Sequence, residues 1–155
     1  MPQDPFLEED SRVLTPEAFQ FVLNNELKRA LRSQNFVTLV LLEPAFRGVP
    51  GDGDDERQQA VRQEARLITR DMRETDLVSQ TGVQLSVVLL DADMENSLRV
   101  IDRLMARLEH YEFPRPLTFE VGAACCPTHG ADADSLRRFA ESRPIRARGD
   151  RYNAQ

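Results

Sequence analysis

Hydrophobic residues follow two spacings along the chain, and these predict helices alternating with strands. Helical spacing indicates four helices, over about 15–32, 56–73, 94–110 and 133–142. Apolar runs rich in branched residues indicate strands over 36–42, 77–90 (as a hairpin) and 117–126. Because helices and strands interleave and the strands include a hairpin, we expect an α/β fold with a central mixed sheet flanked by helices.

The apolar stripe of each helix identifies the residues expected to face the sheet. These are Phe19, Val22, Leu23, Leu27 and Ala30, then Val61, Ala65, Ile68 and Met72, then Leu98, Ile101, Met105 and Leu108. Thr15 and Pro16 mark the first helix start, as a hydroxyl cap followed by proline. The run 36–42 is apolar almost throughout, which predicts the central strand of the sheet.

The hairpin within 77–90 is predicted to turn at Thr81-Gly82, and its tip carries no acid although 30% of the chain is charged. A long loop is expected over 43–55, where prolines, glycines and acids cluster. The acidic part of that loop, 51–56, is interpreted as solvated. A calcium loop is disfavoured because the bidentate glutamate of such loops is missing.

Length and composition fit one domain. The 155 residues, 41% of them hydrophobic, are enough for one core. We expect 1–12 to be a flexible acidic arm and 13–152 to be the domain. The net charge of −6, with arginines spread along the chain, argues against duplex nucleic acid as a partner. Neither a signal peptide nor an apolar run of about 20 residues is present, which predicts a cytoplasmic protein without a membrane partner.

Cysteine and histidine give no sign of redox or metal chemistry. Cys125 and Cys126 are adjacent, which strains a disulfide between them, so we interpret them as small residues on opposite faces of a strand. His110 and His129 lack a second ligand at zinc spacing. We therefore predict no metal and no cofactor.

Several strings resemble one family. Leu14-Thr-Pro-Glu-Ala-Phe19 and Phe119-Glu-Val-Gly-Ala-Ala-Cys-Cys-Pro-Thr-His-Gly130 are similar to segments of the GGDEF family, the diguanylate cyclases that make cyclic di-GMP from two GTP molecules. Arg73-Glu-Thr-Asp76, followed after five residues by Gly82-Val-Gln-Leu-Ser86, is the best anchor. The resemblance covers about 14–152 and implies the three-layer, nucleotide-cyclase-like fold of that family.

The resemblance also implies that the catalytic groups are lost. Gly82-Val83-Gln84-Leu85-Ser86 stands where the family has its signature, so the acids that bind metal are replaced. The family's other metal aspartate falls on Leu42 or Glu43, its guanine-binding segment on 51–55, and its phosphate-binding lysine on Arg146 or Arg148. Two Mg²⁺ ions need anionic oxygen ligands, so we predict a degenerate GGDEF domain without catalytic residues or cyclase activity.

A second site of the family is implied at Arg73, Asp76 and Arg103, which match its product-inhibition site. An arginine fork can hold a phosphate or the O6/N7 edge of guanine, and a carboxylate can accept from guanine N1 and N2. The alternative interpretation is structural: a solvated ion pair in which Asp76 caps the turn into the hairpin, with Arg103 on an exposed helix face.

Two functions stay open. The first is a non-catalytic signalling domain that binds cyclic di-GMP and passes its occupancy to a protein partner or to a second copy in a homodimer. The second is a protein-protein interaction module that keeps the fold and binds no nucleotide. Charge reversal at Arg73 would abolish ligand binding in the first case and leave the partner interaction unchanged in the second.

Overall fold

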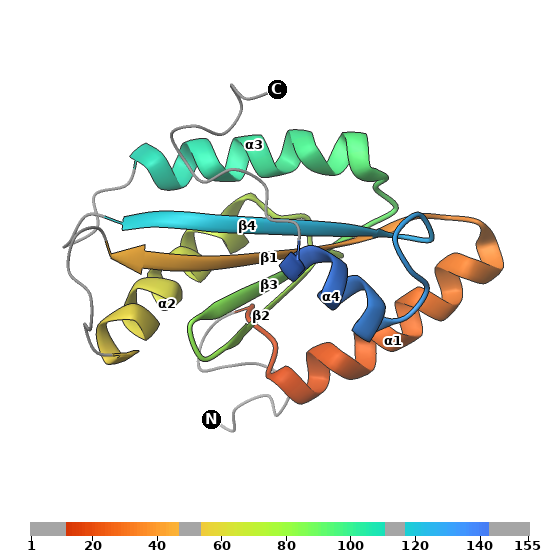
Figure 1. Cartoon of the computed structure of the whole chain (residues 1–155), viewed down its shortest axis with the longest axis horizontal. Coiled ribbons are helices and arrows are strands. Elements are labelled where there is room, and N and C mark those ends of the chain that lie inside the picture. Colours follow the sequence, from red (N-terminus) through yellow and green to blue (C-terminus); the bar gives the residue numbers. More distant parts are fainter. Residues whose placement is uncertain (1–11, 47–53, 111–116, 143–155) are drawn as a thin grey trace.

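The computed structural model describes residues 12–46, 54–110 and 117–142. Its elements are α1 (Pro16–Ser33), β1 (Val37–Phe46), α2 (Asp54–Asp71), β2 (Leu77–Thr81), β3 (Gln84–Leu90), α3 (Met94–His110), β4 (Leu117–Cys126) and α4 (Ala133–Ser142). Figure 1 shows the helices arranged around one sheet. The predicted order of elements is confirmed. Residues 1–11 of the predicted arm, the run 51–53, Arg146 and Arg148 lie outside the described residues.

The sheet has the strand order β2-β3-β1-β4. β1 pairs antiparallel with both neighbours, so that Leu39 lies opposite Val88 on one side and Ala124 on the other. This confirms the run 36–42 as the core of a central strand. Within the described residues, parallel pairing is confined to the bridge between Leu14 and Ser79, so the mixed character of the sheet rests on that bridge.

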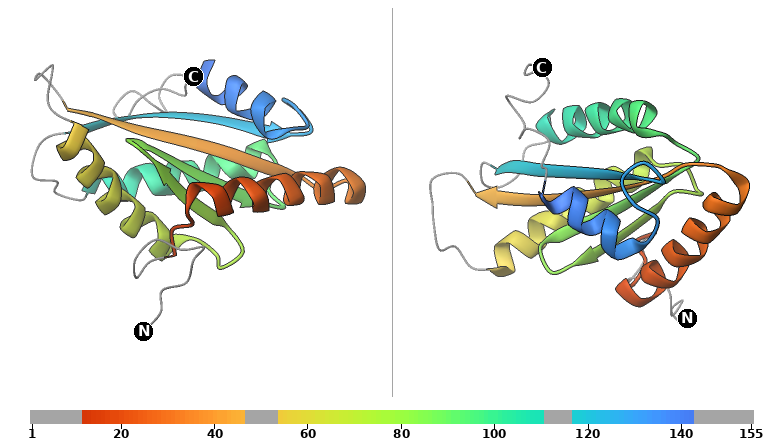
Figure 2. Two further views of the ribbon diagram at one scale, coloured as in Figure 1. Left: turned by 90° about the horizontal axis from the view of Figure 1, so that it is seen from below. Right: turned by 45° about the vertical axis from the view of Figure 1, so that its right-hand side comes forward.

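Each face of the sheet has its own hydrophobic core. On one face, Leu42 and Leu85 belong to a cluster with Ile68 of α2. On the other face, Leu41 belongs to a cluster with Leu23 of α1, and α4 contributes to the same cluster. Figure 2 gives two further views of the sheet between its helices. The α/β fold with helices on both faces is therefore confirmed.

The ends of α1 follow from local chemistry. The Thr15 hydroxyl accepts a hydrogen bond from the Ala18 N–H at 3.3 Å, and Pro16 occupies the first helical position, as predicted. Gln34 ends the helix in the left-handed region, with a φ of 59°, and its N–H donates to the Ala30 carbonyl.

The end of α2 is closed by a residue distant in sequence. Arg12 Nη1 donates to the Thr69 carbonyl at 2.7 Å, and Arg12 Nη2 donates to the Arg73 carbonyl at 2.9 Å. Carbonyls at a helix C-terminus lack partners within the helix, and a cationic donor also suits the dipole there. The segment just before α1 is thus held against the end of α2.

Two core predictions were wrong, since Val22 of α1 is only partly buried and belongs to neither core cluster, and Leu98 of α3 is exposed. Leu98 is 40% exposed rather than buried. The buried residues of α3 are Ser97, Ile101, Leu104, Met105 and Leu108. Ile101, Leu104 and Leu108 follow helical spacing with Ser97, so the small residue Ser97 takes the core position in the first turn and Leu98 falls outside the stripe.

Two boundaries also differ from those predicted. β1 continues through Pro44 to Phe46, where the sequence predicted a loop from Glu43. Residues 43–46 pair with β4 but lie past the end of the pairing with β3, and proline is tolerated where one edge of a strand is unpaired. The hairpin turn is Gly82-Val83 rather than Thr81-Gly82, and Gly82 has the positive φ (60°) that the first position of a II′ turn requires.

Cys125 and Cys126 are fully buried free thiols at the end of β4. Burial raises the pKa of both thiols, which keeps them protonated and unreactive. Their interpretation as small core residues fits this environment. As for the described helices, none has both the length and the apolarity needed to cross a membrane.

Candidate functional site

Arg73 and Asp76 form an ion pair just past the end of α2. Asp76 Oδ2 accepts from the Arg73 backbone N–H and from Arg73 Nε, each at 3.3 Å. Asp76 Oδ1 accepts from Arg73 Nη2 at 3.2 Å and from the Leu90 N–H at 3.4 Å. The Asp76 side chain is 4% exposed and that of Arg73 is 61% exposed. Asp76 therefore ties the end of α2 to the end of β3 and fixes the orientation of Arg73.

The hydrogen bonds of this pair decide which atoms remain open to a ligand. Both oxygens of Asp76 already accept hydrogen bonds, and Arg73 Nη2 also donates to the Leu90 carbonyl at 2.7 Å. Arg73 Nη1 has no hydrogen bond within the described residues. The pair thus offers one open edge of a guanidinium, and the carboxylate acts by holding that guanidinium in place.

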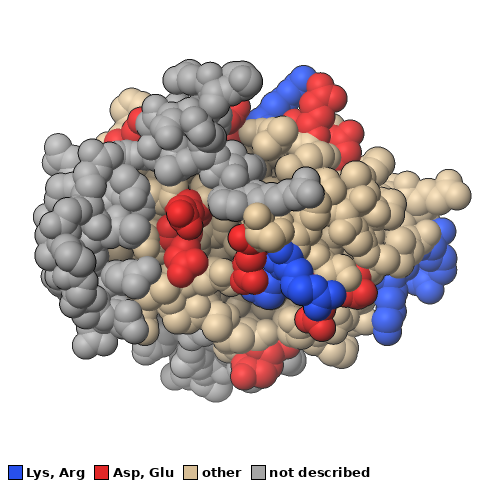
Figure 3. Space-filling view, in the orientation of Figure 1, with Lys and Arg blue, Asp and Glu red and all other residues tan. Residues whose placement is uncertain are grey.

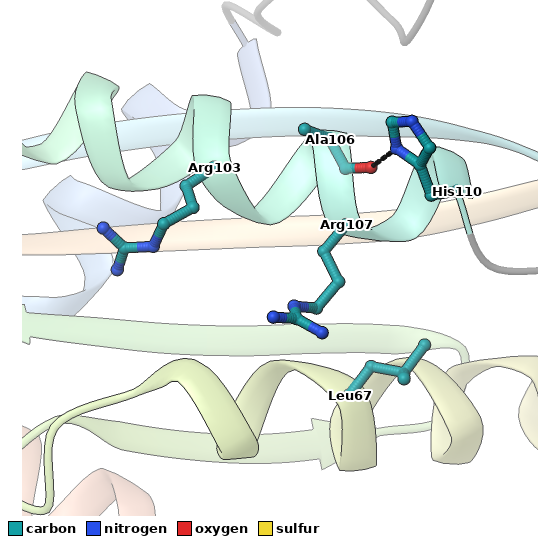
Figure 4. Close-up of a pocket in the computed structure, with 5 residues that line it drawn as sticks. All are labelled: Leu67, Arg103, Ala106, Arg107 and His110. Atoms are coloured by element: carbon teal, nitrogen blue, oxygen red, sulfur yellow. Dashed lines mark hydrogen bonds between the residues drawn. The ribbon is translucent and has the colours of Figure 1, made fainter.

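Arg103, the third predicted residue, lines an open groove of about 410 Å³ on the α2–α3 side of the sheet. The groove is lined by Leu67, Arg103, Ala106, Arg107 and His110. Figure 4 shows Arg103 and Arg107 extending from α3 to the same side, while His110 turns toward the Ala106 carbonyl. That carbonyl lies 2.7 Å from His110 Nδ1. In the part of the chain that the structure describes, Arg103 has no ion pair or hydrogen bond.

An ion pair between helices aligns this groove with the end of α2. Arg107 Nε contacts Asp71 Oδ2, and Asp71 is the last residue of α2, two before Arg73. Arg103 lies one turn before Arg107 on α3. Arg103 and Arg107 line the groove together, whereas Arg73 is not among the residues that line it. Arg107 and Asp71 were not identified from the sequence, because a contact between residues 36 apart leaves no local pattern.

The hairpin residues that align with the family signature make contacts that support the fold. Leu85 is fully buried in the core beneath α2 and α3. Gln84 Oε1 accepts from Arg137 Nη1 at 2.9 Å, and Gln84 Nε2 donates to Glu141 Oε2 at 3.4 Å. These bonds join the tip of the hairpin to α4.

A smaller pocket of about 270 Å³ lies beside Gln84 and carries acidic side chains. Glu43 of β1 and Glu120 of β4 are paired across the sheet, and Glu141 of α4 adds a third carboxylate. The pocket floor includes Gly122, where a Cβ would collide with the backbone carbonyl of Ala140. Figure 3 shows acidic side chains near the centre of the face that α4 occupies, with basic ones beside them. A polyanion such as a triphosphate would meet like charge here.

The residues at the signature do not fit the two Mg²⁺ ions of a cyclase. Leu42 and Leu85 are buried and apolar, Gln84 is uncharged, and Glu43 alone offers an anionic oxygen. Across residues 12–46, 54–110 and 117–142, no group of three or more histidine, cysteine, aspartate or glutamate side chains is arranged to hold a metal ion. Hard divalent cations require several such oxygens.

Glu64 of α2 is a second feature that the sequence analysis missed. It is 0% exposed, and neither carboxyl oxygen has a hydrogen-bond partner among the described residues. Burial raises its pKa well above the ordinary value of 4.5. Glu64 is three residues after Val61 and four before Ile68, so the spacing of the buried stripe does contain a signal for its burial.

Comparisons by sequence find no relative, since no protein family model and no curated protein matches. Comparisons by structure do. The GGDEF domain of DgcB from Caulobacter crescentus, in complex with c-di-GMP, has a TM-score of 0.73 at 13% identity and covers 92% of this chain and 89% of that one. The FimX GGDEF domain from Pseudomonas aeruginosa has a TM-score of 0.73 at 15% identity, covering 88% and 90%. A DGC protein from Thermotoga maritima has a TM-score of 0.71 at 14% identity, covering 90% and 98%.

Proposed function

We propose that this chain, which has the fold of a GGDEF domain, is a non-catalytic signalling domain that binds cyclic di-GMP through Arg73, Asp76 and Arg103. Asp76 contributes by holding Arg73, and the two arginines contact the ligand. Guanidinium groups suit both parts of this ligand, because they bind phosphate oxygens and the O6/N7 edge of guanine.

The observation that carries the proposal is Arg103. Its guanidinium has no hydrogen bond or ion pair within the described residues and lines an open groove between α2 and α3. Surface arginines are often held by neighbouring acids, as Arg99 is held by Glu95 at 3.7 Å on the same helix. Arg103 has no such acid among the described residues, so its guanidinium is open to an anionic ligand.

Loss of catalysis is supported by the other end of the sheet. Phosphoryl transfer depends on metal ions that neutralise the charge of the phosphates. Gln84 is engaged with Arg137 and Glu141, and Leu85 is a core residue, so the hairpin supplies no carboxylate for a metal. We infer that GTP is not a substrate.

Calorimetric titration with cyclic di-GMP, with GTP as the control ligand, tests the proposal. We expect micromolar or tighter binding by the wild type, and a loss of about tenfold or more in Arg103→Gln, because one charge-assisted fork is removed. Arg99→Gln is the matched control, since it removes the same charge from an exposed site on α3, and its affinity should stay within about twofold. Absence of binding by the wild type, or equal losses in both variants, would refute the proposal.

The alternative function is a protein-protein interaction module, and exposed aromatic side chains favour it. Phe21 of α1 is 68% exposed and Phe36, just after α1, is 39% exposed. Aromatic residues are enriched where proteins contact partners. In this case charge reversal at Arg73 would leave the partner interaction unchanged, while replacement of Phe21 by serine would weaken it.

A further inference from the structure

The groove between α2 and α3 holds a second arginine whose orientation is fixed. Arg107 Nε contacts Asp71 Oδ2, while Arg107 Nη1 and Nη2 make no hydrogen bond within the described residues. The Asp71 side chain is 18% exposed and that of Arg107 is 50% exposed. The acid therefore lies beneath the guanidinium and holds it by one edge, and the edge with both terminal nitrogens stays open.

Arg107 and Arg73 differ in which guanidinium nitrogens remain open to a ligand. In Arg73, Nε and Nη2 are taken by Asp76, and Nη2 also donates to the Leu90 carbonyl. Only Nη1 of Arg73 remains open. A bidentate contact with a phosphate needs two neighbouring nitrogens of one guanidinium, and Arg107 offers such a pair through Nη1 and Nη2.

We infer that Arg107, together with Arg103, forms the phosphate-binding part of the ligand site. The two residues are four apart on α3, so their Cβ atoms lie on one helix face about 6 Å apart, and both side chains line the same groove. In Figure 4 both side chains leave the same side of α3, the Arg103 guanidinium extends along the helix away from Arg107, and Leu67 of α2 lies below Arg107. Leu67 supplies an apolar surface for the face of a base.

The dimensions and charge of the groove agree with this ligand class. Its volume of about 410 Å³ lies within the range of small-molecule sites, about 300–1,000 Å³. Arg103 and Arg107 bring two positive charges, and Asp71 offsets one of them, so the groove carries an excess of positive charge. This inference deepens the proposed function and rests on it for the identity of the ligand, whereas the phosphate contact is a property of the groove alone.

Two probes test the inference: cyclic di-GMP and inorganic pyrophosphate, each titrated into the whole chain and followed by the NMR signals of the arginine Nε–H groups. Arg107→Gln should weaken the binding of both probes by about tenfold, since it removes the open fork. Arg107→Lys keeps a positive charge to pair with buried Asp71, so it protects the fold. It should still weaken binding by about threefold or more, because lysine cannot form the bidentate contact. Arg99→Gln should change either affinity by less than about twofold.

The outcomes separate this inference from the proposed function. If pyrophosphate binds and the two Arg107 variants weaken it, Arg107 is a phosphate-binding residue whether or not cyclic di-GMP binds. If cyclic di-GMP binds and both Arg107 variants bind it as the wild type does, the proposed function stands and this inference is overturned. If pyrophosphate does not bind the wild type, or binds all four proteins equally, the inference is also overturned.

Discussion

Two regions of this domain, the end of α2 with its adjoining groove and the tip of the hairpin, differ in which polar groups they leave open. At the end of α2 and in the adjoining groove, arginine side chains are held by acids but keep donors open, as Arg73 and Arg107 do. At the tip of the hairpin, both amide atoms of Gln84 form hydrogen bonds with side chains of α4. The neighbouring pocket carries the carboxylates Glu43 and Glu120.

The two regions differ in the sign of their open charged groups more than in the presence of a pocket. Both regions contain a pocket and both contain charged side chains. In one, the open groups are hydrogen-bond donors with positive charge. In the other, the open groups are acceptors with negative charge, which repel phosphate. The first region therefore suits an anionic ligand, whereas the second repels one.

The largest effect is expected when an acidic side chain is introduced into the hairpin. Leu85→Glu places a carboxylate in a position that is fully buried among apolar residues. We expect a loss of about 4 kcal/mol or more in the free energy of unfolding, because an unpaired charge or an unsatisfied carboxyl is buried. Urea unfolding followed by circular dichroism measures the loss, and the variant should show no turnover of GTP with Mg²⁺.

Leu85→Met is the control for that variant, since it conserves volume and should cost less than about 1.5 kcal/mol. A stable Leu85→Glu variant that turns over GTP would mean that the hairpin is one side chain from activity. In that case the two regions would differ only in the identity of one side chain, and the backbone of the hairpin would still support catalysis.

A second prediction concerns the end of α2. Asp76→Ala leaves the Arg73 and Leu90 backbone N–H groups without the acceptor that both use. Because Asp76 is buried and accepts four hydrogen bonds, we expect its removal to cost about 3 kcal/mol in the free energy of unfolding. Urea unfolding is again the measurement.

The matched control is Asp102→Ala, which removes an exposed carboxylate from α3 and should change stability by less than about 0.5 kcal/mol. A loss in Asp76→Ala no larger than that of the control would mean that Asp76 is not structural. Its oxygens would then be available to a guanine, as the sequence first suggested.

Sequence periodicity predicted the fold because the strands and helices differ in spacing. The unbroken apolar run at 36–42 predicted the central strand, and the pattern at 77–90 predicted the two strands of the hairpin. The prediction for Leu98 failed because α3 has more apolar residues than can face the sheet. Ser97, and not Leu98, is buried in the first turn of the helix. The extension of β1 through Pro44 depends on the pairing partner, which no local pattern records.

The site was predictable only where its residues are near one another in the chain. Arg73 and Asp76 are three apart, so their pairing could be expected, and Arg103 entered through the resemblance to a family. The contact of Arg107 with Asp71 joins two helices and could not be predicted. Glu64 stood at helical spacing with Val61 and Ile68, but its polar character concealed its burial.

Glu64 gives the smallest expected effect and provides a contrast to Asp76, which lies just past the end of α2. Like Asp76 it is a buried carboxyl, but it has no partner among the described residues. Burial raises the pKa of Glu64 well above 4.5, so the folded protein binds a proton that the unfolded chain has released. The contribution of this proton to the free energy of unfolding is fully present below about pH 4.5, and it is lost as the pH rises through the pKa of Glu64 in the folded protein. Glu64→Leu should therefore raise the free energy of unfolding by about 1–2 kcal/mol at pH 8.

Urea unfolding of the wild type and of Glu64→Gln, measured from pH 5 to pH 8, isolates this effect because the other titrating groups are common to both proteins. The stability of the wild type relative to the variant should decrease with increasing pH, by at most about 1.4 kcal/mol per pH unit for one proton. A difference that does not change with pH would mean that Glu64 is ionised when folded. It would then need a compensating cation or water beside its carboxylate.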